Sequence, residues 1–281
     1  MEVNSEGFSG GPIDLKQTQP PRDYLWLHIR ELPYFRSLVR SVEAGYYSRF
    51  DLPAPTLDLG CGDGHFATVA FSRPLDVGLD SDGKSLRQAR RRGGYRTLVR
   101  SVGGKMPFPD EYFGSAMSNS VLEHIPQVEE VLQETHRVLK PGAPFAFCVP
   151  NQNFLGSLSV GRFLDKIHLT KLGDIYRSFF NRISRHCHSD PPETWQARLE
   201  VAGFSLERWW SYYNPRSLQV TEWGHYFGLP CLVWYLLTGK WILVPTRWNL
   251  ALTYHLLWKY FDSIEHQDGV YTFYLARRNQ A

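Results

Sequence analysis

The chain has 281 residues, which is long enough to bury the core of one α/β domain with insertions. Its formal net charge of +3 and the lack of a long Lys and Arg run argue against a nucleic-acid-binding protein. Its four cysteines form no C-x-x-C pair, and residues 1–12 have neither an apolar core nor an early positive charge. These features predict reduced thiols and no secretory signal, and therefore a cytoplasmic protein.

The chain begins with a segment that has no regular pattern. Residues 1–21 are rich in Gly, Ser, Gln and Pro, a composition that predicts disorder. Over residues 35–42, apolar side chains recur at helical spacing. We therefore expect a helix ahead of the first strand.

The next hundred residues alternate between strand-like and helix-like patterns. Short apolar runs predict parallel strands, and periodic apolar stripes predict the helices that connect them. This alternation predicts a doubly wound, mostly parallel sheet with helices on both faces. The predicted strands are 56–59, 77–79, 96–100, 115–119 and 144–149, and the predicted helices are 65–71, 85–92 and 128–139.

Two long connections interrupt the pattern in the second half of the chain. Residues 152–189 follow the fifth strand, and residues 213–268 join a sixth strand at 204–212 to a seventh at 270–276. A hairpin needs only a few residues for such a connection. Both segments leave from the carboxyl ends of strands, the edge at which open α/β sheets bind ligands. We predict a single domain, 22–281, in which these two lid insertions roof the active site.

The second insertion has an unusual composition between residues 223 and 261. It carries four tryptophans after Trp223, and its formal charges are Lys240, Arg247 and Lys259, with no acidic residue. Aromatic side chains with scattered cations suit the interface of an anionic membrane. An ordinary buried subdomain is the main alternative. A spanning segment is disfavoured, because the longest apolar run, 229–237, is far shorter than about 20 residues.

The most informative stretch is residues 57–66, which read LDLGCGDGHF. An apolar strand runs into a glycine-rich turn, where backbone N–H groups can approach a nucleotide-like ligand. The spacing is G-x-G-x-G and differs from the G-x-G-x-x-G that seats a pyrophosphate. Asp80, at the end of the next predicted strand, is placed to bind ribose hydroxyls. The turn therefore suits an adenosyl ligand without a phosphate, such as S-adenosylmethionine, and not a nicotinamide dinucleotide.

Four ordered segments resemble the class I S-adenosylmethionine-dependent methyltransferases of the type 11-like group. They are the glycine turn, Met106-Pro107-Phe108-Pro109-Asp110 with Phe113, Ser118-Asn119-Ser120-Val121-Leu122-Glu123-His124-Ile125, and Arg137-Val138-Leu139-Lys140-Pro141-Gly142. The resemblance is close over 55–151. It implies a seven-stranded sheet whose last strand is antiparallel, S-adenosylmethionine as the cofactor, and methyl transfer as the reaction.

The resemblance also implies roles for individual cofactor-binding residues. The methionine end of the cofactor would be held by backbone contacts from the glycine turn and, through its ammonium group, by Asp58. Asp80 would bind the ribose, and Asn119 would border the methyl group. The family often has an acidic residue beside the adenine, but residues 101–105 contain none, so backbone groups there would substitute. The full predicted set is Asp58, Gly60, Cys61, Gly62, Asp80, Val102, Gly103 and Asn119.

In this family the leading helix often folds over the cofactor. Tyr34 and Arg36 could then close on the methionine end, with simple packing as the alternative. A second departure from the family is Gly114, which stands where an Asp is usual. Together with the missing adenine-side carboxylate, it motivates an alternative function, that of a catalytically inactive methyltransferase-like binding subunit.

Histidines are the candidates for a general base, which a hydroxyl acceptor would require. His124 follows the fourth strand closely, although it could simply cap the next turn. His186 lies in the first lid insertion, two residues before His188, and the alternative for both is a plain loop. We expect no metal site, because two alternate histidines lack the third ligand that a metal needs. The expected acceptor is a small molecule or a lipid-like compound, with no nucleic-acid partner and with peripheral contact to a membrane surface.

Overall fold

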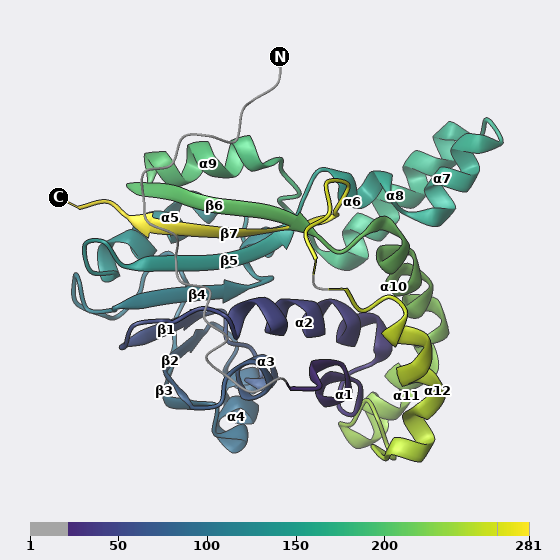
Figure 1. The fold of residues 1–281 in the computed structure, drawn as a ribbon, viewed down its shortest axis with the longest axis horizontal. Helices are drawn as coiled ribbons and strands as arrows, with labels where there is room; N and C mark the ends of the chain where they lie inside the picture. Colours follow the sequence, from purple (N-terminus) through teal and green to yellow (C-terminus); the bar gives the residue numbers. More distant parts are fainter. Residues whose placement is uncertain (1–21, 263, 281) are drawn as a thin grey trace.

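The structure is a computed structural model that describes residues 22–262 and 264–280, so the predicted disordered segment 1–21 lies outside the described residues. Seven strands form one sheet in the order β3-β2-β1-β4-β5-β7-β6 (Figure 1). The strand β7 is antiparallel to its neighbours β5 and β6, and the other pairs are parallel, which confirms the predicted fold class. The strands are β1 (Thr56–Leu59), β2 (Leu75–Asp80), β3 (Tyr95–Arg100), β4 (Ser115–Asn119), β5 (Pro144–Pro150), β6 (Phe204–Tyr212) and β7 (Tyr271–Arg278).

Helices of the domain itself lie on both faces of this sheet (Figure 1). One of them shows how local sequence sets its limits. The helix α4 begins after Asp82, whose carboxylate accepts hydrogen bonds from the N–H groups of Lys84 and Ser85, and it ends at Gly93, which adopts a left-handed conformation. The domain helices are α1 (Tyr24–Ile29), α2 (Tyr34–Tyr47), α3 (His65–Ala70), α4 (Gly83–Arg92), η1 (Leu122–His124), α5 (Val128–Val138) and α9 (Pro192–Val201).

The strand β5 separates two apolar cores. Because side chains alternate along a strand, Phe145 and Phe147 pack on one face with residues of α5 and α9, among them Trp195. On the other face, Ala146 and Cys148 pack with residues of α1, α2 and α3. Burying each large apolar side chain stabilises the fold by about 1.5–3 kcal/mol. The second core holds α2 against the sheet, next to the carboxyl ends of the strands.

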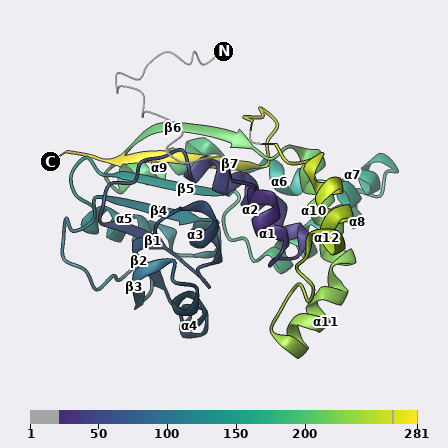
Figure 2. The same cartoon turned by 60° about the horizontal axis from the view of Figure 1, so that its bottom comes forward.

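The two predicted insertions form separate groups of helices. Residues 152–189 contain α6 (Asn153–Gly156), α7 (Ser159–Lys166) and α8 (Thr170–Ser184), and residues 213–268 contain α10 (Pro215–Phe227), α11 (Leu229–Thr238) and α12 (Arg247–Trp258). The helix α10 packs on α2, and α11 extends away from the sheet (Figure 2). Among the described residues, no helix combines the length and the apolar character needed to cross a bilayer.

Candidate active site

The glycine turn after β1 depends on backbone conformations that suit glycine. Gly60 has a φ of +78°, and a Cβ atom there would lie 2.4 Å from Cγ1 of Val121, in the loop after β4. Gly62 has a φ of +54° and open space where its Cβ would be. The first glycine therefore lets two loops meet closely. The second leaves room for a ligand on the open side of the turn.

The N–H groups of this turn are used inside the protein. Those of Gly60 and Cys61 donate to the carbonyl oxygen of Leu79 at 2.8 and 3.0 Å, and that of Gly62 donates to Oδ2 of Asp80 at 2.8 Å. The prediction that these amides face a ligand is therefore wrong. The carbonyl oxygen of Gly60, in contrast, accepts no hydrogen bond from another described residue. Backbone contact from Gly60 to a ligand would run through this oxygen.

Asp80 connects the glycine turn to the loops after β2 and β3. Its Oδ1 accepts a hydrogen bond from the N–H of Asp82 at 2.8 Å, and its backbone oxygen accepts one from Ser101 at 3.1 Å. The next residue, Val102, is 59% exposed. Each carboxylate oxygen of Asp80 keeps a further acceptor position. The Asp80 carboxylate and the exposed Val102 therefore both belong to this edge of the sheet.

Two glycines, Gly103 after β3 and Gly114 immediately before β4, serve packing. A Cβ at Gly103 would lie 3.1 Å from Cγ1 of Val131 in α5. A Cβ at Gly114 would lie only 2.6 Å from the carbonyl oxygen of Ala54. The departure from the family pattern at Gly114 thus has a steric cause in this chain, because any larger residue would collide with backbone.

Asp58 is buried beneath the turn. The hydroxyl of Tyr95 donates a hydrogen bond to its Oδ2 at 2.5 Å, and burial raises the pKa of the carboxyl group to about 7. The side chain does not border the cavity at the sheet edge. Its predicted contact with a ligand ammonium group stays a prediction.

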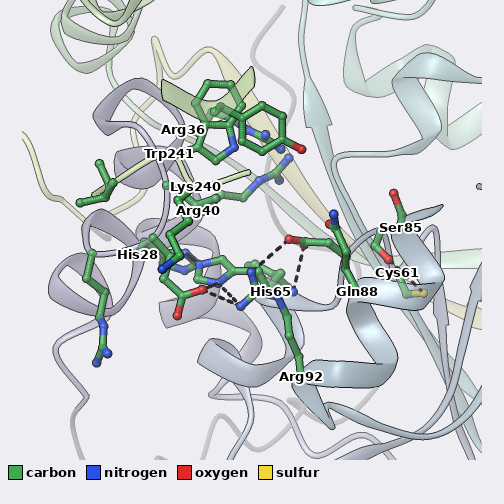
Figure 3. A pocket seen from close by; sticks show the side chains of 18 of the residues that line it. His28, Arg36, Arg40, Cys61, His65, Ser85, Gln88, Arg92, Lys240 and Trp241 are labelled. Atoms are coloured by element: carbon green, nitrogen blue, oxygen red, sulfur yellow. Dashed lines mark hydrogen bonds and ion pairs between the residues drawn. The ribbon is translucent and has the colours of Figure 1, made fainter. Parts of the chain in front are cut away.

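A cavity of about 860 Å³ opens between the glycine turn, α1, α2 and the lid (Figure 3). It brings together five of the predicted site residues: Gly60, Cys61, Gly62, Asn119 and His124. The other five, Asp58, Asp80, Val102, Gly103 and His186, are not part of its wall. The lid contributes Tyr235 and residues 239–243 and 245. The predicted residues therefore fall into a group inside the cavity and a group around its edge.

Cations dominate the charged side chains in this cavity. Two carboxylates, Glu31 and Asp63, also line it, and Arg92 pairs with both of them. Arg36 and Lys240 form no hydrogen bond or ion pair with the described residues through their side chains. Lys240 was not singled out as a site residue from the sequence, because the prediction that the lid roofs the site does not say which lid residues reach the cavity. The lining cations are Arg30, Arg36, Arg40, Arg91, Arg92 and Lys240.

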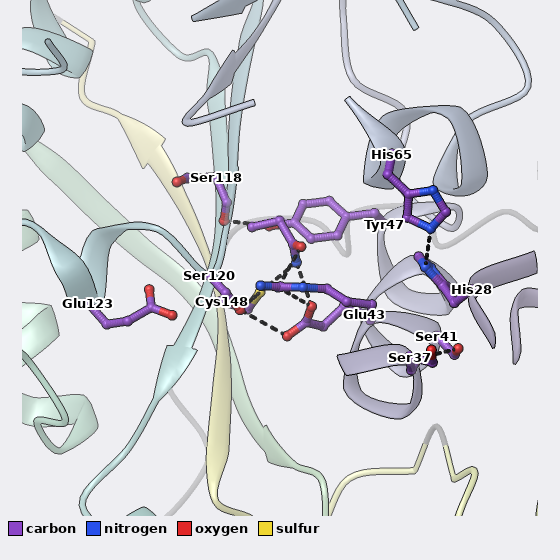
Figure 4. A network of polar contacts seen from close by, with 12 residues as sticks. His28, Ser37, Ser41, Glu43, Tyr47, His65, Ser118, Ser120, Glu123 and Cys148 are labelled. Atoms are coloured by element: carbon purple, nitrogen blue, oxygen red, sulfur yellow. Dashed lines mark hydrogen bonds and ion pairs between the residues drawn. The ribbon is translucent and has the colours of Figure 1, made fainter. Parts of the chain in front are cut away.

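A buried polar network attaches α2 to the end of β4 (Figure 4). Oε2 of Glu43 accepts hydrogen bonds from Arg40 at 2.7 Å and from Asn119 at 2.9 Å, and Oε1 accepts from Ser120 at 3.1 Å and from Tyr212 at 3.0 Å. Arg40 also donates to Oδ1 of Asn119 at 2.7 Å. The network fixes the Arg40 and Asn119 side chains where they line the cavity. Sequence analysis missed Glu43, although a carboxylate in the apolar stripe of a helix is a usable signal.

The two candidate bases lie together. The rings of His124 and His186 have centroids 5.4 Å apart, and Nδ1 of His124 donates to the carbonyl oxygen of Arg185 at 3.0 Å. Burial lowers the pKa of His124, and it lowers the pKa of His186 to about 3. A group with so low a pKa is a weak proton acceptor at neutral pH. This weakens the predicted base role of His186 and leaves His124, on the cavity wall, as the candidate.

The comparisons with known proteins agree with this geometry. Residues 57–147 match the model of a family described as a methyltransferase domain. The chain is 37% identical over 97 residues to 24-methylenesterol C-methyltransferase 2 of Arabidopsis thaliana, covering 32% of this chain and 27% of that protein. It is 29% identical over 173 residues to cycloartenol-C-24-methyltransferase of the same plant, covering 53% and 52%. The chain thus spans between about a quarter and half of the length of these relatives.

Solved structures share the fold. An S-adenosylmethionine-dependent methyltransferase of Thermotoga maritima superposes with a TM-score of 0.52 at 14% identity, covering 88% of this chain and 91% of that one. At such low identity the likeness concerns the fold. Taken together, the domain match, the ordered motifs and the sheet topology identify a class I methyltransferase domain over residues 57–147, whose cofactor is S-adenosylmethionine.

Proposed function

We propose that this chain transfers the methyl group of S-adenosylmethionine to a lipid-like acceptor bound in the cavity, with the lid resting on an anionic membrane surface. The observation that carries the proposal is the extent of the cavity, whose wall runs from Gly60 and Gly62 to Trp241 and Leu243 of the lid. A methyl donor at the turn and an acceptor that enters past the lid would therefore meet in one space.

The residues at the sheet edge fit the cofactor. The unpartnered carbonyl oxygen of Gly60 can accept a hydrogen bond from its ammonium group, and the remaining acceptor positions of Asp80 can bind its ribose hydroxyls. The exposed Val102 offers an apolar surface to the adenine. When bound, the cofactor supplies an electrophilic methyl group on a sulfonium. The chain then acts by positioning, which in intramolecular reactions is worth about 7–11 kcal/mol.

The lid supports a lipid-like acceptor because its apolar side chains face solvent. Leu236 and Leu237 of α11 are 75% and 72% exposed, and Trp248 of α12 is 77% exposed. Exposed apolar patches of this kind mark surfaces that meet a membrane or another apolar partner. Residues 223–261 contain cations and no carboxylate, so an anionic lipid surface complements them best. The names of the two plant relatives, both sterol methyltransferases, support the same acceptor class.

The unpaired cations of the cavity favour an anionic group inside it. Arg36 and Lys240 could hold the carboxylate at the methionine end of the cofactor or an acidic group on the acceptor. The variant Arg36→Ala separates these two sources. Weaker binding of S-adenosylhomocysteine in calorimetry assigns Arg36 to the cofactor. A raised KM for the acceptor with unchanged S-adenosylhomocysteine affinity assigns it to the acceptor.

The central experiment uses S-adenosylmethionine that carries tritium in its methyl group. The purified full chain is incubated with vesicles of a total lipid extract or with the water-soluble extract of the same cells. We expect the label to enter the lipid phase. Label confined to water-soluble products would contradict a lipid acceptor. No transfer to either extract, despite binding of S-adenosylhomocysteine, would favour the inactive binding subunit.

A further inference from the structure

Two loops that are far apart in the sequence are joined next to the cavity. The N–H groups of Cys187 and His188 donate to the carbonyl oxygen of Glu123 at 2.7 and 3.1 Å. A ring nitrogen of His188, Nε2, donates to the carbonyl oxygen of Ile125 at 3.0 Å. These bonds attach the end of the first lid insertion to η1. As a result, His186 is held beside Glu123 and His124.

These three side chains present free ligand atoms to one another. One potential ligand atom from each lies within 4.8 Å of the others, and Oε1 of Glu123 is 3.7 Å from Nε2 of His124. Glu123 is fully buried, and its Oε2 has no hydrogen-bond partner among the described residues. The same holds for the buried Nδ1 of His186. Buried polar atoms without partners are rare in native proteins and call for an explanation.

We propose that Glu123, His124 and His186 bind a divalent first-row metal ion. Two imidazoles and a carboxylate are ligands that Zn²⁺, Mn²⁺ and Fe²⁺ accept, and three protein ligands leave further coordination positions open. Bonds of about 2.0–2.1 Å in a tetrahedral site place the ligand atoms about 3.3 Å apart. The 3.7 Å pair is already near this separation. The remaining separations, up to 4.8 Å, need only a small side-chain adjustment.

The surroundings of His124 are those of a metal ligand. Its Nδ1 donates to the carbonyl oxygen of Arg185 at 3.0 Å, which fixes the tautomer and leaves Nε2 free to coordinate. Metal-bound histidines commonly make such a bond through the second ring nitrogen. The backbone bonds from Cys187 and His188 to Glu123 hold the other two ligands in place. The site therefore has outer contacts of the kind that orient ligands.

The sequence could not indicate this site. His186 and His188 alternate along the chain, but His188 bonds to Ile125 and Arg198, away from the other two ligands. The other two ligands, Glu123 and His124, lie about 60 residues before His186 in the sequence. Only the folded loop brings them to His186, which is why sequence analysis expected no metal.

The position of the site beside the cavity would allow a bound metal ion to act on the acceptor. His124 lines the cavity together with Ser120, Gly60 and Gly62, so an open coordination position there would reach an acceptor oxygen. This use rests on the proposed methyl transfer. The metal would favour loss of the hydroxyl proton to water, and the oxygen would then form a bond to the methyl carbon while the carbon–sulfur bond breaks. The sulfonium thereby becomes the neutral sulfur of S-adenosylhomocysteine.

The test measures metal binding directly. The full chain is freed of metal by a chelator, and ZnSO₄, MnCl₂ or MgCl₂ is titrated calorimetrically. Co²⁺, whose visible absorption reports its ligands, serves as a spectroscopic probe. We expect one Zn²⁺ or Mn²⁺ per chain, and weaker binding by at least about 10-fold in Glu123→Gln and in His186→Ala, since even outer contacts of a metal site are worth that much. His255→Ala, an exposed histidine of α12, is the matched control and should bind as the wild type does.

S-adenosylhomocysteine affinity and circular dichroism confirm that each variant is folded. Equal metal binding by the wild type, Glu123→Gln and His186→Ala would overturn the site, as would absence of binding by the wild type. Loss of binding in His255→Ala alone would also overturn it, because it would locate the ion elsewhere. A chain that binds the metal at these residues but methylates no lipid would contradict the proposed function and leave the site standing.

Discussion

The edge of the sheet and the lid differ in how their side chains find partners. At the sheet edge, both carboxylate oxygens of Glu43 are hydrogen-bonded, and Asp80 accepts bonds from two loops. In the lid, Leu236 and Trp248 face solvent. The side chains at the edge are therefore already held in place for a ligand, whereas the apolar side chains of the lid have no partner among the described residues that covers them. We propose that this difference reflects two ligands, the cofactor at the sheet edge and the acceptor beside the inserted segments.

The comparison has a measurable consequence. Substitutions at the sheet edge should lower the free energy of unfolding or the affinity for cofactor, because each removes a partner from a satisfied group. Substitutions on the exposed face of the lid should leave both almost unchanged. They should instead weaken binding to lipid vesicles.

The largest effect on stability is expected for Glu43→Ala. Removing the carboxylate leaves Arg40 and the hydroxyl of Tyr212 without their buried partner. We expect the free energy of unfolding in urea to fall by about 3–5 kcal/mol. The matched control is Glu265→Ala, which removes an exposed partner of Arg208 and should cost about 0–1 kcal/mol. A loss for Glu43→Ala no larger than that of the control would contradict the role of the network.

A second test compares two glycines with similar backbone conformations. In Gly60→Ala the new Cβ would overlap Val121, so the turn must move, and we expect S-adenosylhomocysteine affinity to fall at least about 100-fold, or about 2.7 kcal/mol. Gly93, at the end of α4, has a φ of +72° and open space around its Cβ position. Gly93→Ala should cost about 1–2 kcal/mol of stability without affecting cofactor affinity. Calorimetry and urea unfolding measure both, and equal losses of affinity would refute the distinction.

Asp58 predicts a pH dependence of stability. In the folded protein this carboxyl group keeps its proton up to about pH 7, whereas its ordinary pKa is 3.8. The unfolded chain therefore binds fewer protons between these values, and the free energy of unfolding should fall as pH rises, by at most about 1.4 kcal/mol per pH unit. Asp58→Asn should lack this contribution. Urea unfolding of both proteins from pH 4 to 8 checks the slope, and parallel curves would contradict the assignment.

The smallest effect on stability is expected in the lid. In the double variant Leu236→Ser and Trp248→Ser, both side chains are exposed, so unfolding should change by no more than about 0.5 kcal/mol. Flotation with anionic vesicles should nevertheless weaken by at least about 10-fold, because each buried apolar side chain is worth about 1.5–3 kcal/mol. Vesicle binding that does not depend on these residues, or on anionic lipid, would contradict the proposed contact between the lid and a membrane.

The sheet could be predicted because its strands are specified locally. Apolar runs that end in Gly60 or Asp80 fix both the strand and the edge at which it ends, and the stop at Lys140-Pro141-Gly142 does the same for α5. The antiparallel β7 followed from the family resemblance, whereas the order of the strands was not predicted. Local sequence patterns were therefore sufficient to predict the strands and the edge of the sheet at which they end.

The site could be predicted only where its residues follow that pattern. The use of the turn amides was missed, because their partners, Leu79 and Asp80, are assigned by the pairing of β1 with β2. Glu43, Glu123 and Lys240 were missed for a related reason. Their hydrogen-bond partners, or the residues that line the cavity opposite them, lie more than 60 residues away in the sequence. The spacing of residues along one sequence does not reveal such contacts.

A crystal structure of the full chain with S-adenosylhomocysteine would show directly whether the cofactor binds at this sheet edge. We expect ribose hydroxyls within hydrogen-bond distance of Asp80, the ammonium group at the carbonyl oxygen of Gly60, and the sulfur facing the cavity beside Asn119. A ligand bound elsewhere, or one whose sulfur points away from the cavity, would contradict this expectation.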